Sequence, residues 1–223
     1  MPMPTSRSAV AEDPLNTAPM SESLRALARR GERRHARRGV QLIVEGDVGD
    51  TLYIVLQGRL RAYSVGIDGR EVTYATYGPG EYAGEMGLDG GPRSANVEAV
   101  DSSLCVVVTR PTLQAHLNAD PDFAFELLSK VIRRARAATL GLKQIALNDV
   151  YGRLKALLES LAVPADAQGR KAVDPAPSHL EMSQQLGCSR EMVSRVMKDL
   201  ERGEYVEVGR RRVMLLRELP AKW

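Results

Sequence analysis

The stretch Gly187-Cys188-Ser189-Arg190-Glu191-Met192-Val193-Ser194-Arg195 joins a glycine turn to a short helix with two chemically different faces. With Arg190 as the first helical residue, five apolar residues recur at helical spacing and are expected to face a core: Met192, Val193, Val196, Met197 and Leu200. Five polar residues share the opposite side: Arg190, Glu191, Ser194, Arg195 and Lys198. Arginine matches the two acceptors that guanine presents in the major groove, and glutamate accepts from the cytosine amino group. This face is therefore predicted to read base edges of DNA.

A supporting helix is predicted just upstream. Ser178-His179-Leu180-Glu181 forms a capping box, and the helix that it opens contains Leu180, Met182 and Leu186 before Gly187 ends it. Helix, glycine turn and helix together predict a helix-turn-helix, and the alternative is an ordinary surface helical hairpin. Ser178, His179 and Ser189 are also predicted to contact DNA, with His179 as a neighbour of a phosphate; the alternative for His179 is a solvated helix residue, and neither makes it a metal ligand.

Downstream of this unit, two strand-like runs flank the basic sequence Gly209-Arg210-Arg211-Arg212. The runs are residues 205–208 and 213–216, and they predict a hairpin with a basic tip, the wing of a winged helix. Arg210 and Arg211 are expected to lie against phosphates, where they would contribute affinity without sequence information.

Composition limits the remaining possibilities. A chain of 223 residues with 43% hydrophobic content can bury a core in each of one or two domains. No apolar run approaches the roughly 20 residues that span a bilayer, so we expect a cytoplasmic protein without a membrane partner. Cys105 and Cys188 are expected to be plain thiols. The net charge of +3 predicts no nucleic-acid binding by itself, but basic residues cluster around the expected recognition helix.

The N-terminal half contains strand-like runs after an unpatterned start. Residues 1–20 lack periodicity and are expected to be a mobile leader without a fold. Short strand-like runs separated by glycine turns then follow at residues 41–44, 51–56, 59–65, 72–77 and 103–108. Their close spacing predicts a compact antiparallel barrel or roll.

A long helix is predicted over residues 120–147. Its apolar positions alternate in steps of three and four: Leu128, Val131, Ala135, Ala138, Leu142 and Ile145. This heptad pattern predicts a two-stranded coiled coil and hence a homodimer, and the alternative is a helix that packs only on its own barrel. Asn148-Asp149 interrupts the pattern, and a separate helix capped by Asp149 is expected over residues 150–161. Residues 163–177 are expected to be a loop.

A candidate site for a phosphorylated ligand lies at Gly84-Glu85-Met86-Gly87-Leu88-Asp89-Gly90-Gly91-Pro92-Arg93-Ser94. Gly84 allows the backbone to approach a ligand, and a helical turn that starts near Glu85 aims free amides at an anion. Arg93 can bind phosphate oxygens while Ser94 donates a hydroxyl. Glu85 would repel phosphate, so it is expected to accept from a sugar hydroxyl. An ordinary loop with a structural ion pair is the alternative.

These motifs, in this order, resemble the cyclic AMP receptor and fumarate-nitrate regulator (CRP/FNR) family of bacterial transcription factors from about residue 21 onward. The resemblance implies an α+β fold with a jelly-roll-like double-stranded β-helix that binds cyclic nucleotides (21–119), a dimerisation helix (120–147) and a winged helix-turn-helix (148–223). It implies that Glu85 meets the ribose, that Arg93 and Ser94 meet the cyclic phosphate, and that the base-reading triplet is Arg190, Glu191 and Arg195. It adds Arg134 and Thr139 of the central helix as ligand contacts, and Met86 is counted with the nucleotide site.

The implied partners are a palindromic operator, a second copy of the chain and RNA polymerase. The arginines near residues 29–38 offer a basic surface for RNA polymerase, and the alternative is that they form a solvated charged helix. The implied effector is cyclic AMP. The family's threonine-serine pair is replaced by Ala138-Thr139, which removes one purine contact and keeps cyclic di-GMP open as an alternative. A constitutive DNA binder with a vestigial nucleotide site is a further alternative.

Enzymatic function is not expected, because the chain has no Walker loop, no Gly-x-Ser-x-Gly elbow and no zinc-spaced histidine pair. Neither a metal site nor a haem site is expected, since the chain lacks an N-terminal cysteine set and its only histidines are His35, His116 and His179.

Overall fold

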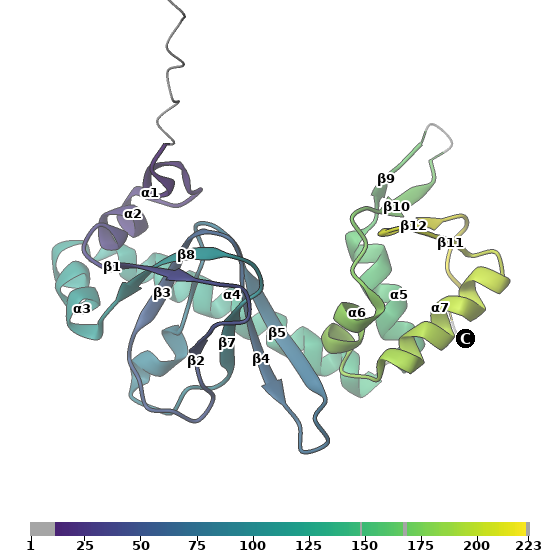
Figure 1. The fold of residues 1–223 in the computed structure, drawn as a ribbon, viewed down its shortest axis with the longest axis horizontal. Helices are drawn as coiled ribbons and strands as arrows, with labels where there is room; N and C mark the ends of the chain where they lie inside the picture. The colour runs from purple at the N-terminus through teal and green to yellow at the C-terminus, as the bar shows by residue number, and fades with distance from the viewer. Residues whose placement is uncertain (1–11, 148, 167–168, 222–223) are drawn as a thin grey trace, which may run out of the picture. The chain divides into compact units, whose positions relative to one another are not determined.

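The computed structural model describes residues 12–147, 149–166 and 169–221, without the side chains of 143–147 (Figure 1). The chain forms two compact units, one made of the residues up to Ala62 together with Ala75–Leu128, the other of Tyr63–Tyr74 together with the residues from Ser129 on. Each unit is a helix-and-strand assembly, and the expected α+β class is confirmed.

The N-terminal strands form two four-stranded sheets, ordered β1-β8-β3-β6 and β2-β7-β4-β5. Their bounds are β1 Glu32–Ala36, β2 Gln41–Ile43, β3 Leu52–Gln57, β4 Leu60–Val65, β5 Glu71–Tyr77, β6 Tyr82–Ala83, β7 Asn96–Ala99 and β8 Ser103–Val108. The pairs β1–β8, β3–β8, β3–β6 and β2–β7 are antiparallel. The predicted roll is therefore confirmed, although β1, β6 and β7 were not foreseen.

Strand β3 explains how the roll is held together. Its side chains alternate between two clusters: Leu52, Ile54 and Leu56 pack with the helices, whereas Tyr53 and Val55 pack between the two sheets. Because β3 is buried on both faces, its sequence is an uninterrupted apolar run.

The N-terminal region is more ordered than expected. A short helix α1, Pro14–Thr17, begins after Asp13, whose carboxylate accepts from the backbone N of Leu15 at 3.0 Å. Leu15 and Ala18 are buried, and the guanidinium of Arg25 donates to the Ala18 carbonyl at 3.1 Å. The expectation of an unfolded leader is thus wrong for residues 12–20, because a capping aspartate before proline is itself a helix start. Residues 1–11 lie outside the described part.

The arginine-rich segment at residues 29–38 is not the charged helix that we considered. Helix α2, Glu22–Ala28, ends before it, and β1 takes up Glu32–Ala36. Strand β1 pairs with the apolar β8, with Arg34 opposite Cys105. Pairing with a buried strand thus overrides the local preference of a charged run.

Two helices follow β8. Helix α3, Arg110–Ala119, was not foreseen and begins at Thr109, whose hydroxyl accepts from Thr112 N at 3.4 Å. Helix α4, Asp122–Leu147, confirms the predicted long helix. Its heptad residues are exposed, among them Leu128 at 54%, Val131 at 40% and Leu142 at 68%. Ile145 is a heptad position whose side chain is outside the described part.

The second unit contains a three-helix, four-stranded assembly that follows α4. Its elements are α5 Val150–Leu161, β9 Val163–Pro164, β10 Lys171–Val173, α6 His179–Leu186, α7 Arg190–Arg202, β11 Val206–Gly209 and β12 Arg212–Leu215. Asp149 caps α5 as predicted, accepting from Gly152 N at 2.8 Å. The expected loop at 163–177 is partly wrong, because β9 and β10 extend the wing into a sheet of order β11-β12-β10-β9.

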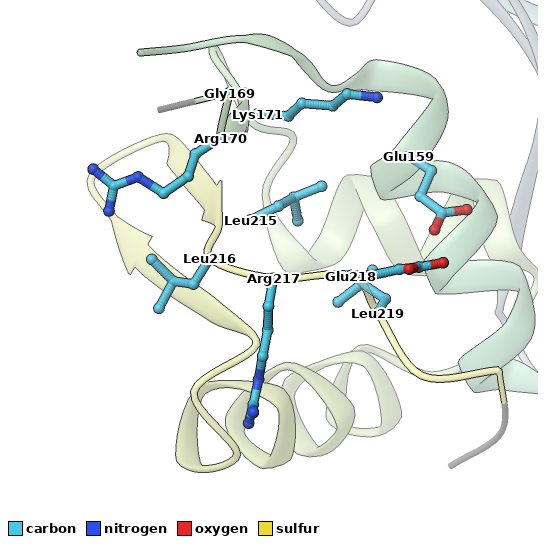
Figure 2. Close-up of a pocket in the computed structure, with 9 residues that line it drawn as sticks. All are labelled: Glu159, Gly169, Arg170, Lys171, Leu215, Leu216, Arg217, Glu218 and Leu219. Atoms are coloured by element: carbon cyan, nitrogen blue, oxygen red, sulfur yellow. The ribbon is translucent and has the colours of Figure 1, made fainter. Parts of the chain in front are cut away.

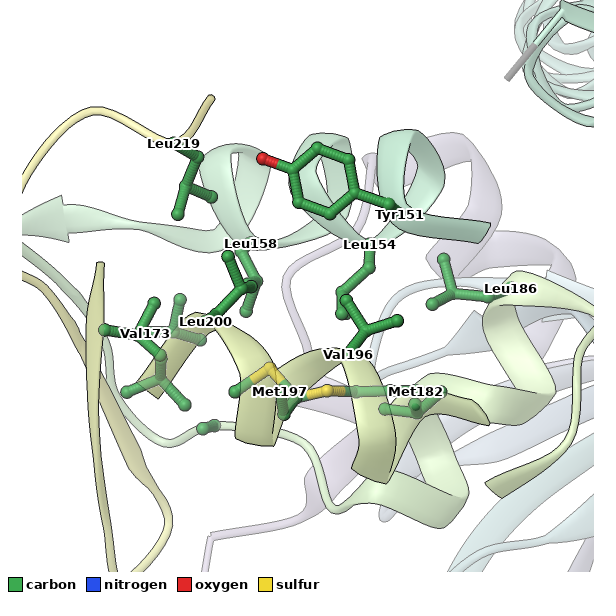
Figure 3. Packing of buried hydrophobic residues seen from close by; sticks show 14 residues of the cluster. Tyr151, Leu154, Leu158, Val173, Met182, Leu186, Val196, Met197, Leu200 and Leu219 are labelled. Carbon is green, nitrogen blue, oxygen red and sulfur yellow. The ribbon is translucent and has the colours of Figure 1, made fainter. Parts of the chain in front are cut away.

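One apolar cluster joins these helices and strands (Figure 3). Leu154 and Leu158 of α5 and Met197 and Leu200 of α7 are at most 1% exposed and pack together with Met182 of α6. Fully burying side chains of this size stabilises the fold by about 1.5–3 kcal/mol each. The cluster therefore fixes α7 against α5 and α6.

Candidate functional site

The phosphate-site residues predicted from the sequence surround one buried arginine. Arg93 follows the 3₁₀ turn η1, Glu85–Asp89, and is only 6% exposed. Its Nη1 donates to the Gly84 carbonyl at 2.8 Å. Its Nη2 donates to the Thr51 carbonyl and to the Thr51 Oγ1, each at 2.9 Å. The guanidinium is thus held by neutral acceptors from two separate loops.

Glycines make room for this guanidinium. Gly84 has φ 97°, and a Cβ built on it would lie 2.6 Å from the Thr51 carbonyl oxygen and 3.0 Å from Arg93 Nη1. A Cβ on Gly87 would lie 2.5 Å from the Gly49 carbonyl oxygen. Because backbone atoms stand in the way at both positions, only glycine fits there.

The charge of Arg93 has no ionic partner in the described part of the chain. Burial lowers the pKa of Arg93, while the negative potential of Tyr53, Asp50 and Glu85 raises it. A buried cation is costly unless it is paired, and neutral carbonyls compensate it only in part. This environment favours an anionic ligand.

The other predicted nucleotide contacts lie around Arg93 or on α4. Glu85, half-buried, is the first residue of η1, and the exposed Ser94 donates its hydroxyl to the sulfur of Met86 at 3.3 Å. Met86 is 62% exposed. The structure therefore brings Gly84, Glu85 and Arg93 together and leaves Ser94 open to solvent. Arg134 and Thr139 belong to α4, where Arg134 is half-buried and Thr139 donates to the Ala135 carbonyl at 3.0 Å.

The helix-turn-helix has the predicted caps. The Ser178 hydroxyl accepts from Glu181 N at 3.2 Å, and the Glu181 carboxylate accepts from Ser178 N at 2.7 Å. Gly187 ends α6 with φ 63°, and the Ser189 hydroxyl then caps α7 by accepting from Met192 N at 3.2 Å. A left-handed residue followed at once by a serine cap makes the tight turn between the two helices.

The two faces of α7 divide as predicted, with one correction on each helix of the pair. Val193, Val196, Met197 and Leu200 are buried, but Met192 is 36% exposed. Leu180 of α6 is likewise 52% exposed and does not join the core. Both residues lie in the first turn of their helix.

The predicted reading face is open to solvent. The side chains of Arg190, Glu191, Arg195 and Lys198 are exposed and have no hydrogen bond or ion pair within the described residues. Ser194 is half-buried, and its hydroxyl lies 2.9 Å from His179 Nδ1 on α6. Four charged groups thus remain available for DNA, while Ser194 links the two helices.

The wing places its arginines at a tight turn. Gly209 pairs with Arg212, so that Arg210 and Arg211 form the tip and are exposed. Arg211 has φ 55°, a left-handed conformation. Arg212 forms an ion pair with Asp174, with 3.8 Å between Nε and Oδ2. The predicted basic tip is therefore confirmed in shape, with Arg210 and Arg211 free to face phosphates.

Two features were not foreseen. Thr51 was expected only as the start of a strand, since nothing in an isolated threonine indicates that it holds an arginine 42 residues away.

A pocket of about 370 Å³ also lies in the second unit (Figure 2), lined by Glu159, Gly169, Arg170, Lys171, Leu215, Leu216, Arg217, Glu218 and Leu219. Its lining carries both signs of charge and none of the predicted DNA contacts.

Within the described residues, no helix meets the length and apolarity of a membrane span, and no group of three or more His, Cys, Asp or Glu is placed to hold a metal. Both cysteines are free thiols, and burial raises the pKa of Cys105 to about 11.

Two family models match separate parts of the chain. The cyclic nucleotide-binding domain family matches residues 33–120, and the Crp-like helix-turn-helix domain family matches residues 152–220. The chain is 34% identical over 182 residues to the cyclic AMP receptor protein of Thermus thermophilus, covering 80% of this chain and 81% of the relative. It is 28% identical over 181 residues to the CRP-like cAMP-activated global transcriptional regulator of Mycobacterium tuberculosis, covering 80% and 81%.

The fold matches a solved structure over nearly all of its length. The c-di-GMP responsive global regulator CLP of Xanthomonas campestris superposes with a TM-score of 0.77 at 24% identity, covering 88% of this chain and 99% of that one. These relatives are transcription regulators rather than enzymes. The sequence identity, the two matched domains and the shared fold together show that the chain belongs to the CRP/FNR family of bacterial transcription regulators.

Proposed function

We propose that the chain is a homodimeric transcription regulator in which a cyclic nucleotide, cyclic AMP before others, controls binding to a palindromic operator. The observation that supports the effector most directly is Arg93, a buried guanidinium that carbonyls and a hydroxyl hold and that has no carboxylate partner among the residues the structure describes. A cyclic phosphate supplies the missing negative charge. Gly84, Glu85, Met86 and Ser94 complete the proposed contacts in this unit, and Arg134 and Thr139 remain proposals from the family resemblance.

Cyclic AMP is preferred because of what two relatives are named for. The Thermus thermophilus and Mycobacterium tuberculosis relatives are a cyclic AMP receptor and a cAMP-activated regulator by name. The Xanthomonas campestris protein responds to c-di-GMP by its title, but at 24% identity it supports the fold alone. Cyclic di-GMP stays an alternative because Ala138 removes a purine contact of the family.

DNA binding is proposed to use α7 and the wing. Arg190, Glu191 and Arg195 would read bases, and Lys198, Arg210 and Arg211 would meet phosphates. Ser178, His179 and Ser189, at the starts of α6 and α7, would lie near the backbone, and Ser194 would support the reading face. The open charges on this face support the assignment.

Dimerisation is proposed to occur along α4. Large apolar side chains rarely stay exposed in a regular stripe, and Leu128, Val131 and Leu142 are 40–68% exposed along the heptad positions. A parallel partner helix would cover them by knobs-into-holes packing. The proposed division is thus a nucleotide-binding part (21–119), a dimer helix (120–147) and a DNA-binding part (148–223).

Contact with RNA polymerase through Arg29, Arg30, Arg37 and Arg38 is a further proposal.

The test is a titration of the full-length protein with cyclic AMP, cyclic GMP and cyclic di-GMP by calorimetry, paired with binding to an operator selected from a random-sequence DNA pool. We expect cyclic AMP to bind best and to tighten operator binding by about 5- to 150-fold. Tighter binding of cyclic di-GMP than of cyclic AMP would make cyclic di-GMP the effector in place of cyclic AMP. Equal operator binding with and without every nucleotide would instead identify a constitutive DNA binder.

A further inference from the structure

Thr51 has an unusual relation to Arg93. It lies directly before β3, and both of its oxygen acceptors serve the same nitrogen: the carbonyl and the hydroxyl each accept from Arg93 Nη2 at 2.9 Å. The Gly84 carbonyl accepts from the other terminal nitrogen, Nη1, at 2.8 Å. Two loops therefore accept hydrogen bonds from the two terminal nitrogens of one guanidinium.

These hydrogen bonds affect ligand binding because an arginine binds phosphate through a planar set of donors, whose direction is fixed by the plane of the guanidinium. Three of the hydrogen bonds that these donors can make are used by Thr51 and Gly84, whereas Nε has no hydrogen bond within the described residues. Glycine lines the other side, since a Cβ on Gly49 would lie 3.2 Å from Nε and from Nη2. With glycine instead of a side chain there, Thr51 is the side chain that orients the group.

We propose that Thr51 is a positioning residue of the anion site: its hydroxyl fixes the plane of the Arg93 guanidinium so that the remaining donors meet the phosphate of the ligand. The inference rests on the proposed function, because it assumes that Arg93 binds a cyclic nucleotide. Thr51 itself need not touch the ligand. It lowers the cost of ordering Arg93 when the ligand arrives, which is the gain of a preorganised site.

Two substitutions separate a hydrogen-bonding role from a packing role. Thr51→Val keeps the branched shape and the backbone carbonyl but removes the hydroxyl acceptor. Thr51→Ser keeps the hydroxyl and removes a methyl group. The matched control is Thr76→Val, at an exposed threonine of β5.

The experiment is calorimetric titration of the full-length parent and these variants with cyclic AMP, cyclic GMP and cyclic di-GMP, with unliganded thermal unfolding recorded alongside. We expect Thr51→Val to weaken binding of the preferred nucleotide about tenfold, as for loss of a hydrogen bond to a charged group. Thr51→Ser should restore affinity to within about twofold of the parent, and Thr76→Val should leave it unchanged.

The possible results are distinct. Tenfold loss in Thr51→Val with rescue in Thr51→Ser supports the inference. Parent-like affinity in Thr51→Val overturns it and leaves the proposed function intact. Equal loss in both Thr51 variants with a lowered unfolding temperature also overturns it, because the side chain would then act by packing. A parent that binds none of the nucleotides overturns the proposed function and this inference together.

Discussion

Replacing Arg93 by alanine tests the proposed effector site most directly. The side chain is 6% exposed and has no carboxylate partner in the described part, so a bound phosphate would be its main ionic contact. Two charge-assisted hydrogen bonds to phosphate, at about 1.5–3 kcal/mol each, amount to about 3–6 kcal/mol. We therefore expect Arg93→Ala to weaken nucleotide binding by roughly 10² to 10⁴.

The same change should have a smaller effect on folding. Alanine leaves the carbonyls of Gly84 and Thr51 without their donor, which costs about 1–3 kcal/mol for each acceptor that stays dry. It also removes a buried charge that only neutral groups compensate, and Ser94 beside it is open to water. Because these effects oppose each other, we expect the free energy of unfolding to fall by about 1–2 kcal/mol.

The assay is calorimetric titration together with thermal unfolding at a nucleotide concentration 100 times the parent's Kd, where the ligand stabilises the parent by about 2.7 kcal/mol. The variant should show no such stabilisation. Arg59→Ala is the matched control, because Arg59 is an exposed arginine of the same unit whose Nε pairs with Asp101 at 3.0 Å. If Arg93→Ala binds nucleotide as the control does, the phosphate does not meet Arg93 and the reasoning fails.

Four further predictions concern other parts of the chain. Arg195→Ala should lose about 1–3 kcal/mol on the selected operator but little on random DNA, and an equal loss on both in gel-shift titrations would assign this arginine to a phosphate. Leu142→Glu should yield monomers in analytical ultracentrifugation, whereas Leu140→Glu, 62% exposed but off the heptad positions, should not; a dimer in both cases argues against the α4 seam. Leu200→Ala should reduce the free energy of unfolding by about 2–5 kcal/mol in urea, and a loss well below that range would mean that the cluster is loosely packed. Cys105, whose pKa burial raises to about 11, should resist a thiol reagent at pH 8 until the protein unfolds. Rapid labelling at Cys105 of the native protein, located by peptide mass spectrometry, would contradict its burial.

Local signals in the sequence were sufficient for the helix-turn-helix, the α5 cap and the wing tip, but not for strands β9 and β10. The capping box at Ser178, the glycine turn at Gly187 and the apolar spacing of α7 are short-range features, and the structure shows each of them. Asp149 as the cap of α5 and the basic tip of the wing were predictable for the same reason. Met192 and Leu180 are exposed although they lie at apolar positions, because periodicity gives the direction of a side chain but not what covers it.

The N-terminal unit depends more on contacts between distant residues. Strand β1 is an exposed, charged segment that is a strand because β8 pairs with it. Thr51 contacts Arg93 across 42 residues, and the pairing follows from the closure of the roll rather than from any local pattern. The motif around Gly84 and Arg93 predicted an anion site, which stays a prediction, but it did not indicate that carbonyls would hold the arginine.

The packing of the DNA reader limits how an effector can control it. Helix α7 is fixed to α6 by the buried Met182, Val193 and Met197, by a turn with caps on both sides, and by the contact of His179 Nδ1 with the Ser194 hydroxyl at 2.9 Å. Rearranging α7 within its own domain would break this cluster at several kcal/mol, more than the 1–3 kcal/mol of a typical coupling between sites. Two such readers in a dimer must reach major grooves about 34 Å apart. We infer that a nucleotide regulates the spacing or orientation of two rigid readers and leaves each reader's own structure unchanged.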